Sequence, residues 1–196
     1  MRLWILSDMH ADRGIGDVAV HAPKFDVMVC AGDVVTGDIA MSIEMVAAIS
    51  RGKPALFVAG NHEWRGSIDA VLENGRAAAD RHGIHWLELD TVEIGGVRFA
   101  GATLWTPLDL RFRASVRCLQ AARADVVITH FPPPENELRR ILHGGGLWIC
   151  GHHHGHEDSM IGGRRLVRNA LGYGAAEDLV DSKPARQDFV IEFVWP

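Results

Sequence analysis

The sequence predicts an α/β layered fold with mixed sheets, and two observations support that prediction. Short apolar runs alternate with helical patterns along the first part of the chain, and paired strand patterns follow later. The alternation is typical of parallel strands joined by helices, whereas strands paired by tight turns indicate antiparallel hairpins. We therefore expect parallel and antiparallel strands within the same sheets.

Five apolar runs are expected to form the central strands. They are rich in β-branched and aromatic residues and show little polar alternation, which fits strands that are covered on both faces. The runs are residues 3–6, 27–31, 55–59, 126–128 and 147–150.

Helical patterns lie between these runs. Residues 39–50 place Ile39, Ile43 and Val46 on one stripe, and Asp38 precedes them as a suitable N-cap. The other helices are expected over residues 68–82, 113–123 and 135–142.

Two hairpins follow from Gly-Gly pairs. Gly95-Gly96 and Gly162-Gly163 each lie between alternating apolar and polar residues, and such a pair suits a two-residue turn. Residues 189–195 are expected to form a final strand.

Composition limits the class of protein. The chain has 196 residues, which suits one domain spanning residues 1–196. A formal net charge of −5 argues against a nucleic-acid polymer as a partner. Three cysteines without CxxC spacing favour a reducing compartment. The sequence shows neither a signal-peptide core nor a membrane-spanning run, so we expect a cytoplasmic protein without a membrane partner.

Each predicted central strand is followed at once by residues that bind metals or transfer protons. Functional groups in an open α/β sheet collect beyond the carboxyl ends of its strands, so we expect all five clusters to converge on one edge. In strand order the clusters are Asp8 and His10; Asp33; Asn61, His62 and Glu63; His130; and His152, His153 and His154.

Residue spacing adds an orientation. In extended backbone, residues two apart point to the same side. Asp8 and His10 should then reach one ion together, and His152 and His154 should face one site. By the same argument His153 should point away and tolerate replacement.

Seven of these residues are candidate metal ligands, and they mix carboxylate, imidazole and amide groups. Such a set suits Mn²⁺, Fe²⁺, Zn²⁺ or Ni²⁺, of which we favour Mn²⁺. Seven ligands are too many for one four-coordinate ion, so two divalent ions with a shared carboxylate are expected. The candidates are Asp8, His10, Asp33, Asn61, His130, His152 and His154.

The ordered set "SDMH", "AGD", "AGNHE", "ITH" and "CGHHH" over residues 7–154 resembles the calcineurin-like metallophosphoesterase superfamily. The resemblance implies a four-layer αββα sandwich of two mixed β-sheets flanked by helices. It also implies that Asp33 bridges two ions. The first ion would be held by Asp8, His10, Asp33 and His154, and the second by Asp33, Asn61, His130 and His152.

One position departs from the family pattern. Many members read Gly-Asp-x-x-Asp, where the second aspartate supports the site. This chain has Thr36 at that position, whereas every residue matching a metal ligand is retained.

The resemblance implies a metal-dependent phosphoric ester hydrolase. A hydroxide between the ions would attack the phosphorus of a small phosphate mono- or diester. His62 would serve as the general acid for the leaving oxygen, with Asp33 as the other catalytic residue. Asn61 and Arg65 are the candidate substrate contacts, although a surface arginine is an equally good interpretation of Arg65.

Two other functions remain open at this stage. A cyclic-nucleotide phosphodiesterase of the same superfamily shares these motifs. A non-catalytic metal-binding scaffold on the same fold, like the retromer subunit that resembles this family, is the alternative from another class.

Several further side chains have two interpretations. Trp64 and Trp105 suit core packing better than stacking on a substrate ring. Arg111 and Arg113 suit a solvated helix face better than a substrate-side loop, and His156 could contact substrate. Glu63 is expected to support its turn.

Overall fold

The computed structural model describes residues 1–13, 22–142, 146–173 and 183–194. Its first sheet has the strand order β11-β1-β2-β3-β4. Strands β1 to β4 are parallel, and β11 is antiparallel to β1. The strands are β1 (Arg2–Leu6), β2 (Val27–Cys30), β3 (Ala55–Phe57), β4 (His85–Trp86) and β11 (Val190–Glu192).

The second sheet has the order β5-β6-β7-β8-β10-β9. Its centre is parallel, and the edge strands β5 and β9 pair antiparallel with β6 and β10. Both sheets are therefore mixed, as the sequence predicts. The strands are β5 (Asp90–Ile94), β6 (Val97–Ala102), β7 (Val126–Thr129), β8 (Leu147–Cys150), β9 (Gly155–Ile161) and β10 (Arg164–Ala170).

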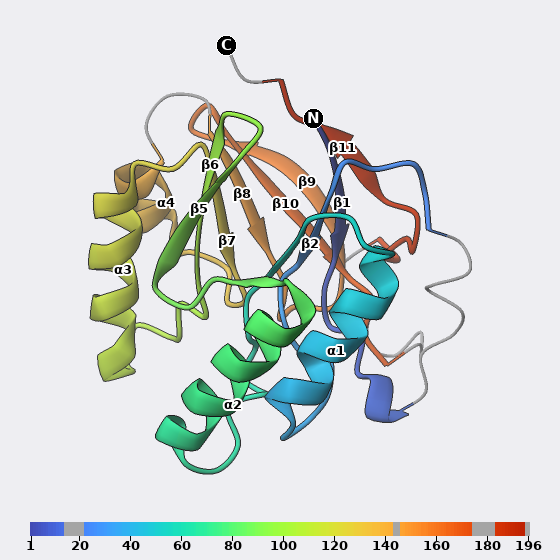
Figure 1. The fold of residues 1–196 in the computed structure, drawn as a ribbon. Coiled ribbons are helices and arrows are strands. Elements are labelled where there is room, and N and C mark those ends of the chain that lie inside the picture. The colour runs from blue at the N-terminus through green and yellow to red at the C-terminus, as the bar shows by residue number, and fades with distance from the viewer. Residues whose placement is uncertain (14–21, 143–145, 174–182, 195–196) are drawn as a thin grey trace.

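The helices cover the outer faces of the two sheets (Figure 1). Helices α1 and α2 lie against the first sheet, and α3 and α4 lie against the second. The order helix, sheet, sheet, helix confirms the expected four layers. The helices are α1 (Ile39–Ser50), α2 (Ile68–His82), α3 (Leu110–Ala122) and α4 (Glu135–Ile141), with a 3₁₀ turn over Ala11–Arg13.

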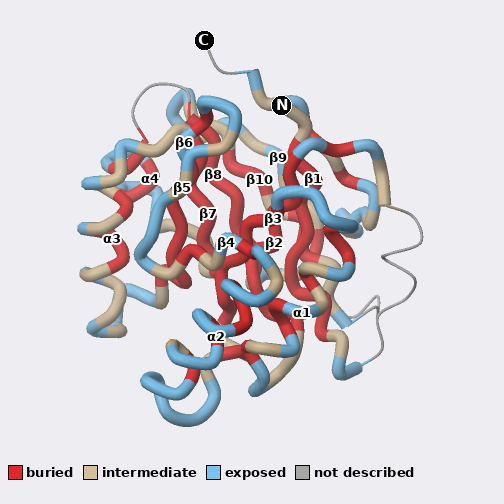
Figure 2. The backbone as a smooth tube through the Cα atoms, viewed as in Figure 1, coloured by how far each residue is buried: buried red, intermediate tan, exposed pale blue. Residues whose placement is uncertain are grey.

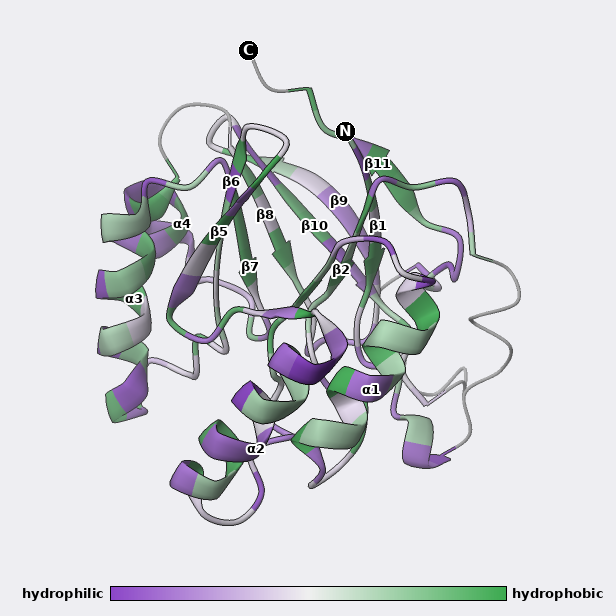
Figure 3. Cartoon of the chain, viewed as in Figure 1, coloured by the Kyte–Doolittle hydropathy of each residue, from purple (hydrophilic) through white to green (hydrophobic). Residues whose placement is uncertain are grey.

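Strand alternation explains how each sheet is buried on both faces. Trp4 and Leu6 of β1 pack toward α1 and α2, while Leu3 and Ile5 pack between the two sheets. A third apolar layer lies between the second sheet and α3 and α4. Figure 2 shows the central strands as buried, and Figure 3 shows that they are mostly apolar while helix α2 carries more polar residues.

Local signals set most of the element ends. Asp38 caps α1, since its side chain accepts a hydrogen bond from the backbone N–H of Met41 at 2.9 Å. Helix α3 begins at Leu110, earlier than the expected residue 113, because the side chain of Asp109 accepts from the N–H of Arg111. Both Gly-Gly hairpins are confirmed.

Two strands differ from expectation. Strand β4 is too short to be recognised from the sequence, and the final strand covers only Val190–Glu192 of the expected residues 189–195. Among the described residues, no helix is long and apolar enough to cross a membrane.

Candidate metal centre

Hydrogen bonds connect the loops that follow the strands at this edge of the two sheets. The N–H of Asp8 donates to the carbonyl of Gly32 at 2.8 Å, and the N–H of Gly151 donates to the carbonyl of His130 at 2.9 Å. The N–H of His152 donates to Oδ2 of Asp8 at 3.0 Å. This last bond links the end of the second sheet to the end of the first, so the two sheets meet at the candidate site.

The side chains that follow these strands form three overlapping clusters. Within each cluster the possible ligand atoms lie within 4.8 Å of one another. The clusters are Asp8, His10 and His154; His10, Asp33 and His62; and Asp33, His130 and His152.

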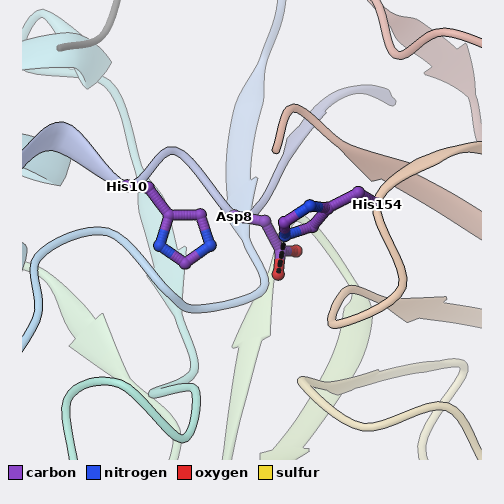
Figure 4. A group of neighbouring side chains, drawn as sticks. All are labelled: Asp8, His10 and His154. Atoms are coloured by element: carbon purple, nitrogen blue, oxygen red, sulfur yellow. Dashed lines mark ion pairs between the residues drawn. The ribbon is translucent and has the colours of Figure 1, made fainter. Parts of the chain in front are cut away.

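The first cluster joins the end of β1 to the segment after β8. Figure 4 shows the carboxylate of Asp8 beside the ring of His154, with His10 on its other side. Nε2 of His154 lies 3.8 Å from Oδ1 of Asp8, whose side chain is fully buried. One carboxylate and two imidazoles therefore approach a common point.

The third cluster joins the end of β2 to both central strands of the second sheet. Nε2 of His130 lies 3.4 Å from Oδ2 of Asp33 and 3.0 Å from Oδ1 of Asn61. Asn61 thus lies beside this cluster. His152 and His154, two residues apart, lie in different clusters.

The extended-backbone expectation for these segments is wrong. Strands β1 and β8 end at Leu6 and Cys150. Beyond them Asp8, His10 and His152 have φ angles of 53°, 43° and 68°, which is left-handed backbone. The side chains converge because the chain turns sharply at each strand end, rather than because residues two apart share one face of a strand.

His153 is exposed and belongs to none of the clusters found in the described part of the chain. Its backbone N–H donates to the carbonyl of Gly151 at 2.9 Å, as part of the turn. It is therefore set apart from its neighbours, although the cause is the turn and not strand alternation.

Two glycines allow the close packing of this site. A Cβ at Gly60 would lie 2.1 Å from Oδ1 of Asp33, and one at Gly151 would lie 2.6 Å from Oδ2 of Asp8. Any side chain at either position would displace a carboxylate of the clusters.

Glu63 is buried and ties two strand-end turns together. Its Oε2 accepts from the N–H groups of Asp33 at 3.0 Å and Gly60 at 2.7 Å, and its Oε1 accepts from Val34 at 2.6 Å. Burial, with the charge of Asp33, raises the pKa of this carboxyl group to about 7. The expected supporting role of Glu63 thus has a defined set of contacts.

Burial and nearby charges set the pKa values of three histidines at the site. Desolvation lowers the pKa of His10 and of His152 to about 4, so both rings are neutral at pH 7 and keep a free lone pair. Burial opposes the charge of His130 as well, but its hydrogen bond to Asp33 and the charges of Asp8 and Asp33 outweigh that effect and raise its pKa.

The donor set fits metal ions. The buried Nε2 of His10 has no hydrogen-bond partner among the residues that the structure describes. Nδ1 of His130 lies 2.8 Å from the carbonyl of Ala31, which can only accept, so Nδ1 donates and Nε2 faces Asp33. An imidazole that donates one N–H to a carbonyl and binds through its other nitrogen is typical of a metal ligand, and an ion at Nε2 of His130 would replace the proton that this nitrogen directs at Asp33.

Two residues, Thr36 and Tyr173, make contacts at the site that were not anticipated. Oγ1 of Thr36 lies 3.0 Å from Nδ1 of His62. The ring of Tyr173 lies 4.3 Å from that of His10 and 4.9 Å from that of His154, between ring centroids. Tyr173 follows β10, so its position after another strand end was the available signal.

The remaining candidates lie in different settings. Arg65 and Arg113 are exposed. The ring of His156 packs on Phe189, with centroids 4.5 Å apart, and it belongs to none of the described clusters. Arg111 stacks on Trp105, with its guanidinium carbon 3.3 Å from the ring centroid.

Comparison with known proteins agrees with this geometry. The family of calcineurin-like phosphoesterases matches residues 1–156. The chain belongs to that family, and its Asp and His clusters could hold metal ions.

Solved structures share the fold at low sequence identity. One is a phosphopantetheinyl hydrolase from Mycobacterium tuberculosis, with a TM-score of 0.61, 16% identity, and coverage of 87% of this chain and 89% of that one. Another is a putative 5′-nucleotidase from Staphylococcus aureus, with a TM-score of 0.56, 13% identity, and coverage of 85% and 48%. The comparison with curated proteins gave no match.

Proposed function

We propose that this chain is a dinuclear metal-dependent phosphoesterase that hydrolyses a small phosphate mono- or diester. The observation that supports it most is the convergence of ligand-bearing turns from both sheets on overlapping clusters that share His10 and Asp33. Asp33 is a buried carboxylate that belongs to two of these clusters, as a ligand that bridges two ions would.

The proposed ligands divide between two ions, with Mn²⁺ as the favoured metal. Asp8, His10, Asp33 and His154 hold the first, and Asp33, Asn61, His130 and His152 hold the second. When bound, divalent ions at such a site bind phosphoryl oxygens and lower the pKa of water.

His62 is the proposed general acid. Its Nε2 lies 3.9 Å from Oδ2 of Asp33, and its Nδ1 lies beside the hydroxyl of Thr36. Asp33 also accepts from the backbone N–H of His62 at 2.9 Å. The ring is thus held at the edge of the clusters, where Nε2 can carry a proton to the leaving oxygen. Asn61 and the exposed Arg65 are the proposed substrate contacts.

The test loads chelator-treated protein with Mn²⁺ and measures bound metal together with hydrolysis of p-nitrophenyl phosphate and bis-(p-nitrophenyl) phosphate. Two bound ions with turnover are expected, and Asp33→Asn should lose both. Stoichiometric metal without hydrolysis of either ester would favour a non-catalytic scaffold.

The role of His62 has its own test. His62→Ala should keep both ions and lose turnover by about 10²-fold or more on an alkyl ester, since a general acid contributes about that much. The loss should be smaller on a p-nitrophenyl ester, whose leaving group needs less protonation. His85→Ala, at an exposed histidine of β4, is the matched control. Equal losses on both esters would contradict the role.

A further inference from the structure

Three half-buried aromatic side chains form a row that begins at the candidate metal centre. The ring centroid of Phe131, after β7, lies 4.2 Å from that of His152. Trp105, after β6, lies 6.0 Å from Phe131, and Trp64, after β3, lies 6.0 Å from Trp105. We call Phe131, Trp105 and Trp64 the aromatic row. Phe131 and Trp64 follow strands whose ends also supply candidate ligands, and Trp105, after β6, lies between them.

A hydrogen bond to the protein interior fixes the position of Trp64. Nε1 of Trp64 donates to Oγ1 of Thr103 at 2.9 Å, and that oxygen lies 2.9 Å from the carbonyl of Ala59. The polar atom of Trp64 is therefore already engaged inside the protein. Trp64 therefore offers a ligand ring surface and not a hydrogen-bond donor.

The rings of the row are tilted to one another, by 57° between Trp64 and Trp105 and by 33° between Trp105 and Phe131. Arg111 lies over one face of Trp105. Its guanidinium carbon lies 3.3 Å from the centroid of Trp105, and its side chain is 40% exposed. Asp109 accepts from Nε at 2.9 Å and from Nη2 at 2.6 Å. This two-point contact fixes the guanidinium plane over Trp105 and offsets its charge, so Arg111 presents a planar face more than a free cation.

Two exposed leucines lie in the neighbouring segment. Leu108 and Leu110 are 98% and 90% exposed on either side of Asp109. The charge of Arg111 is paired with Asp109. The surface is matched to a flat, weakly charged group.

We propose that the aromatic row and Arg111 form a subsite for a nucleobase, which stacks there while the phosphate of the same molecule lies at the Asp and His clusters. Bases stack on aromatic rings and on guanidinium planes through their π-faces. The inference rests on the proposed function, because it requires a phosphate at the clusters.

The test compares two ligands that differ only by the base. These are the 5′-methylenephosphonates of adenosine and of ribose, in which carbon replaces the ester oxygen so that neither is hydrolysed. Calorimetric titration of the Mn²⁺-loaded protein should give a Kd for the adenosine analogue at least about fivefold lower, the effect of one stacked base. Equal Kd values would overturn the proposal.

Four variants test whether Trp105 and Arg111 cause the preference for the analogue that carries a base. Trp105→Ala should bring the Kd of the adenosine analogue close to that of the ribose analogue, whereas Trp105→Phe keeps a flat ring and should retain most of the difference. Arg111→Lys keeps the charge and loses the plane, so it should weaken the preference as Arg111→Ala does. Retention of the full preference in Trp105→Ala would also overturn the proposal. Met160→Ala, at an exposed residue of β9, is the control for both ligands.

Hydrolysis of bis-(p-nitrophenyl) phosphate and bound metal are measured on the same preparations. Hydrolysis without a base-dependent difference in binding refutes the subsite alone. Neither hydrolysis nor binding of either phosphonate refutes the phosphoesterase function and the subsite with it. Unfolding curves of each variant show whether a lost preference reflects a lost fold.

Discussion

The hydroxyl oxygen of Thr36 lies 3.0 Å from Nδ1 of His62. The family resemblance leads us to expect an aspartate at this position, and Thr36 instead places a neutral hydroxyl beside the proposed acid. A hydroxyl both donates and accepts, and it can therefore orient the ring in either tautomer.

We expect Thr36→Val to lower kcat by about tenfold, the value of one lost hydrogen bond of roughly 1.4 kcal/mol, because the ring of His62 loses its only side-chain contact at Nδ1 among the described residues. Metal content and KM should stay unchanged, and Thr36→Ser should retain activity. Steady-state kinetics at saturating Mn²⁺ give the comparison. A fall in metal content in Thr36→Val would assign this residue to the metal site instead.

We expect His153→Ala to retain its metal, whereas His152→Ala should lose one ion. His153 is exposed and outside the clusters, and His152 lies in a cluster with Asp33 and His130. Metal analysis after gel filtration gives the number of bound ions per protein chain. Equal metal loss in the two variants would contradict the observed turn over residues 151–154.

Glu63→Gln should destabilise the protein by about 1–3 kcal/mol for each backbone N–H that loses its acceptor. Both carboxylate oxygens of Glu63 accept hydrogen bonds from backbone N–H groups. In Glu63→Gln one of these oxygens becomes an NH₂ group, which cannot accept, so the N–H groups on that side lose their acceptor. Urea unfolding measures the change. Glu44→Gln, at an exposed residue of α1, is the control and should be neutral.

Glu88 gives a prediction of pH dependence. Burial raises its pKa to about 7, although its Oε2 accepts from the N–H and Oγ1 of Thr103 at 3.0 and 2.8 Å. The unfolded chain loses this proton near the ordinary value of 4.5. The unfolded state therefore binds fewer protons between these values, and this group makes stability fall as pH rises from 4.5 through 7.

Glu88→Gln removes the titration and keeps an oxygen for Thr103. We expect the variant to be more stable than the wild type at pH 8, by at most about 3 kcal/mol, and to show little gain at pH 4.5. Urea unfolding of chelator-treated protein at both pH values measures the difference. Glu73→Gln, at an exposed position of α2, should show no such trend. An equal gain in stability at both pH values would show that the pKa of Glu88 is not raised in the folded protein.

The four-layer architecture was predictable because it follows from local patterns and the family resemblance. The five central runs are buried on both faces, and Asp38 and the Gly-Gly pairs act within a few residues of their own positions. Helix α4 begins at Glu135, directly after three prolines, as the sequence indicates.

The geometry of the site was less predictable because distant contacts set it. The turn at Asp8 depends on a hydrogen bond to Gly32, and the position of Tyr173 depends on Gly172, whose N–H donates to the carbonyl of Asp8. Thr36 and His62 are 26 residues apart. Extended geometry was the simplest local assumption for residues two apart, and tertiary hydrogen bonds replaced it.

The left-handed backbone of the candidate site has a consequence for engineering. Asp8, His10, Asp33 and His152 have φ angles of 53°, 43°, 55° and 68°. A side chain in this conformation costs roughly 1–2 kcal/mol relative to right-handed backbone, and glycine avoids most of that cost. Glycine at His10 or His152 would remove this cost together with a metal-binding group, so selection for heat resistance alone works against metal binding at these positions. A thermostable library of this protein should hold the four residues constant and seek its gains elsewhere.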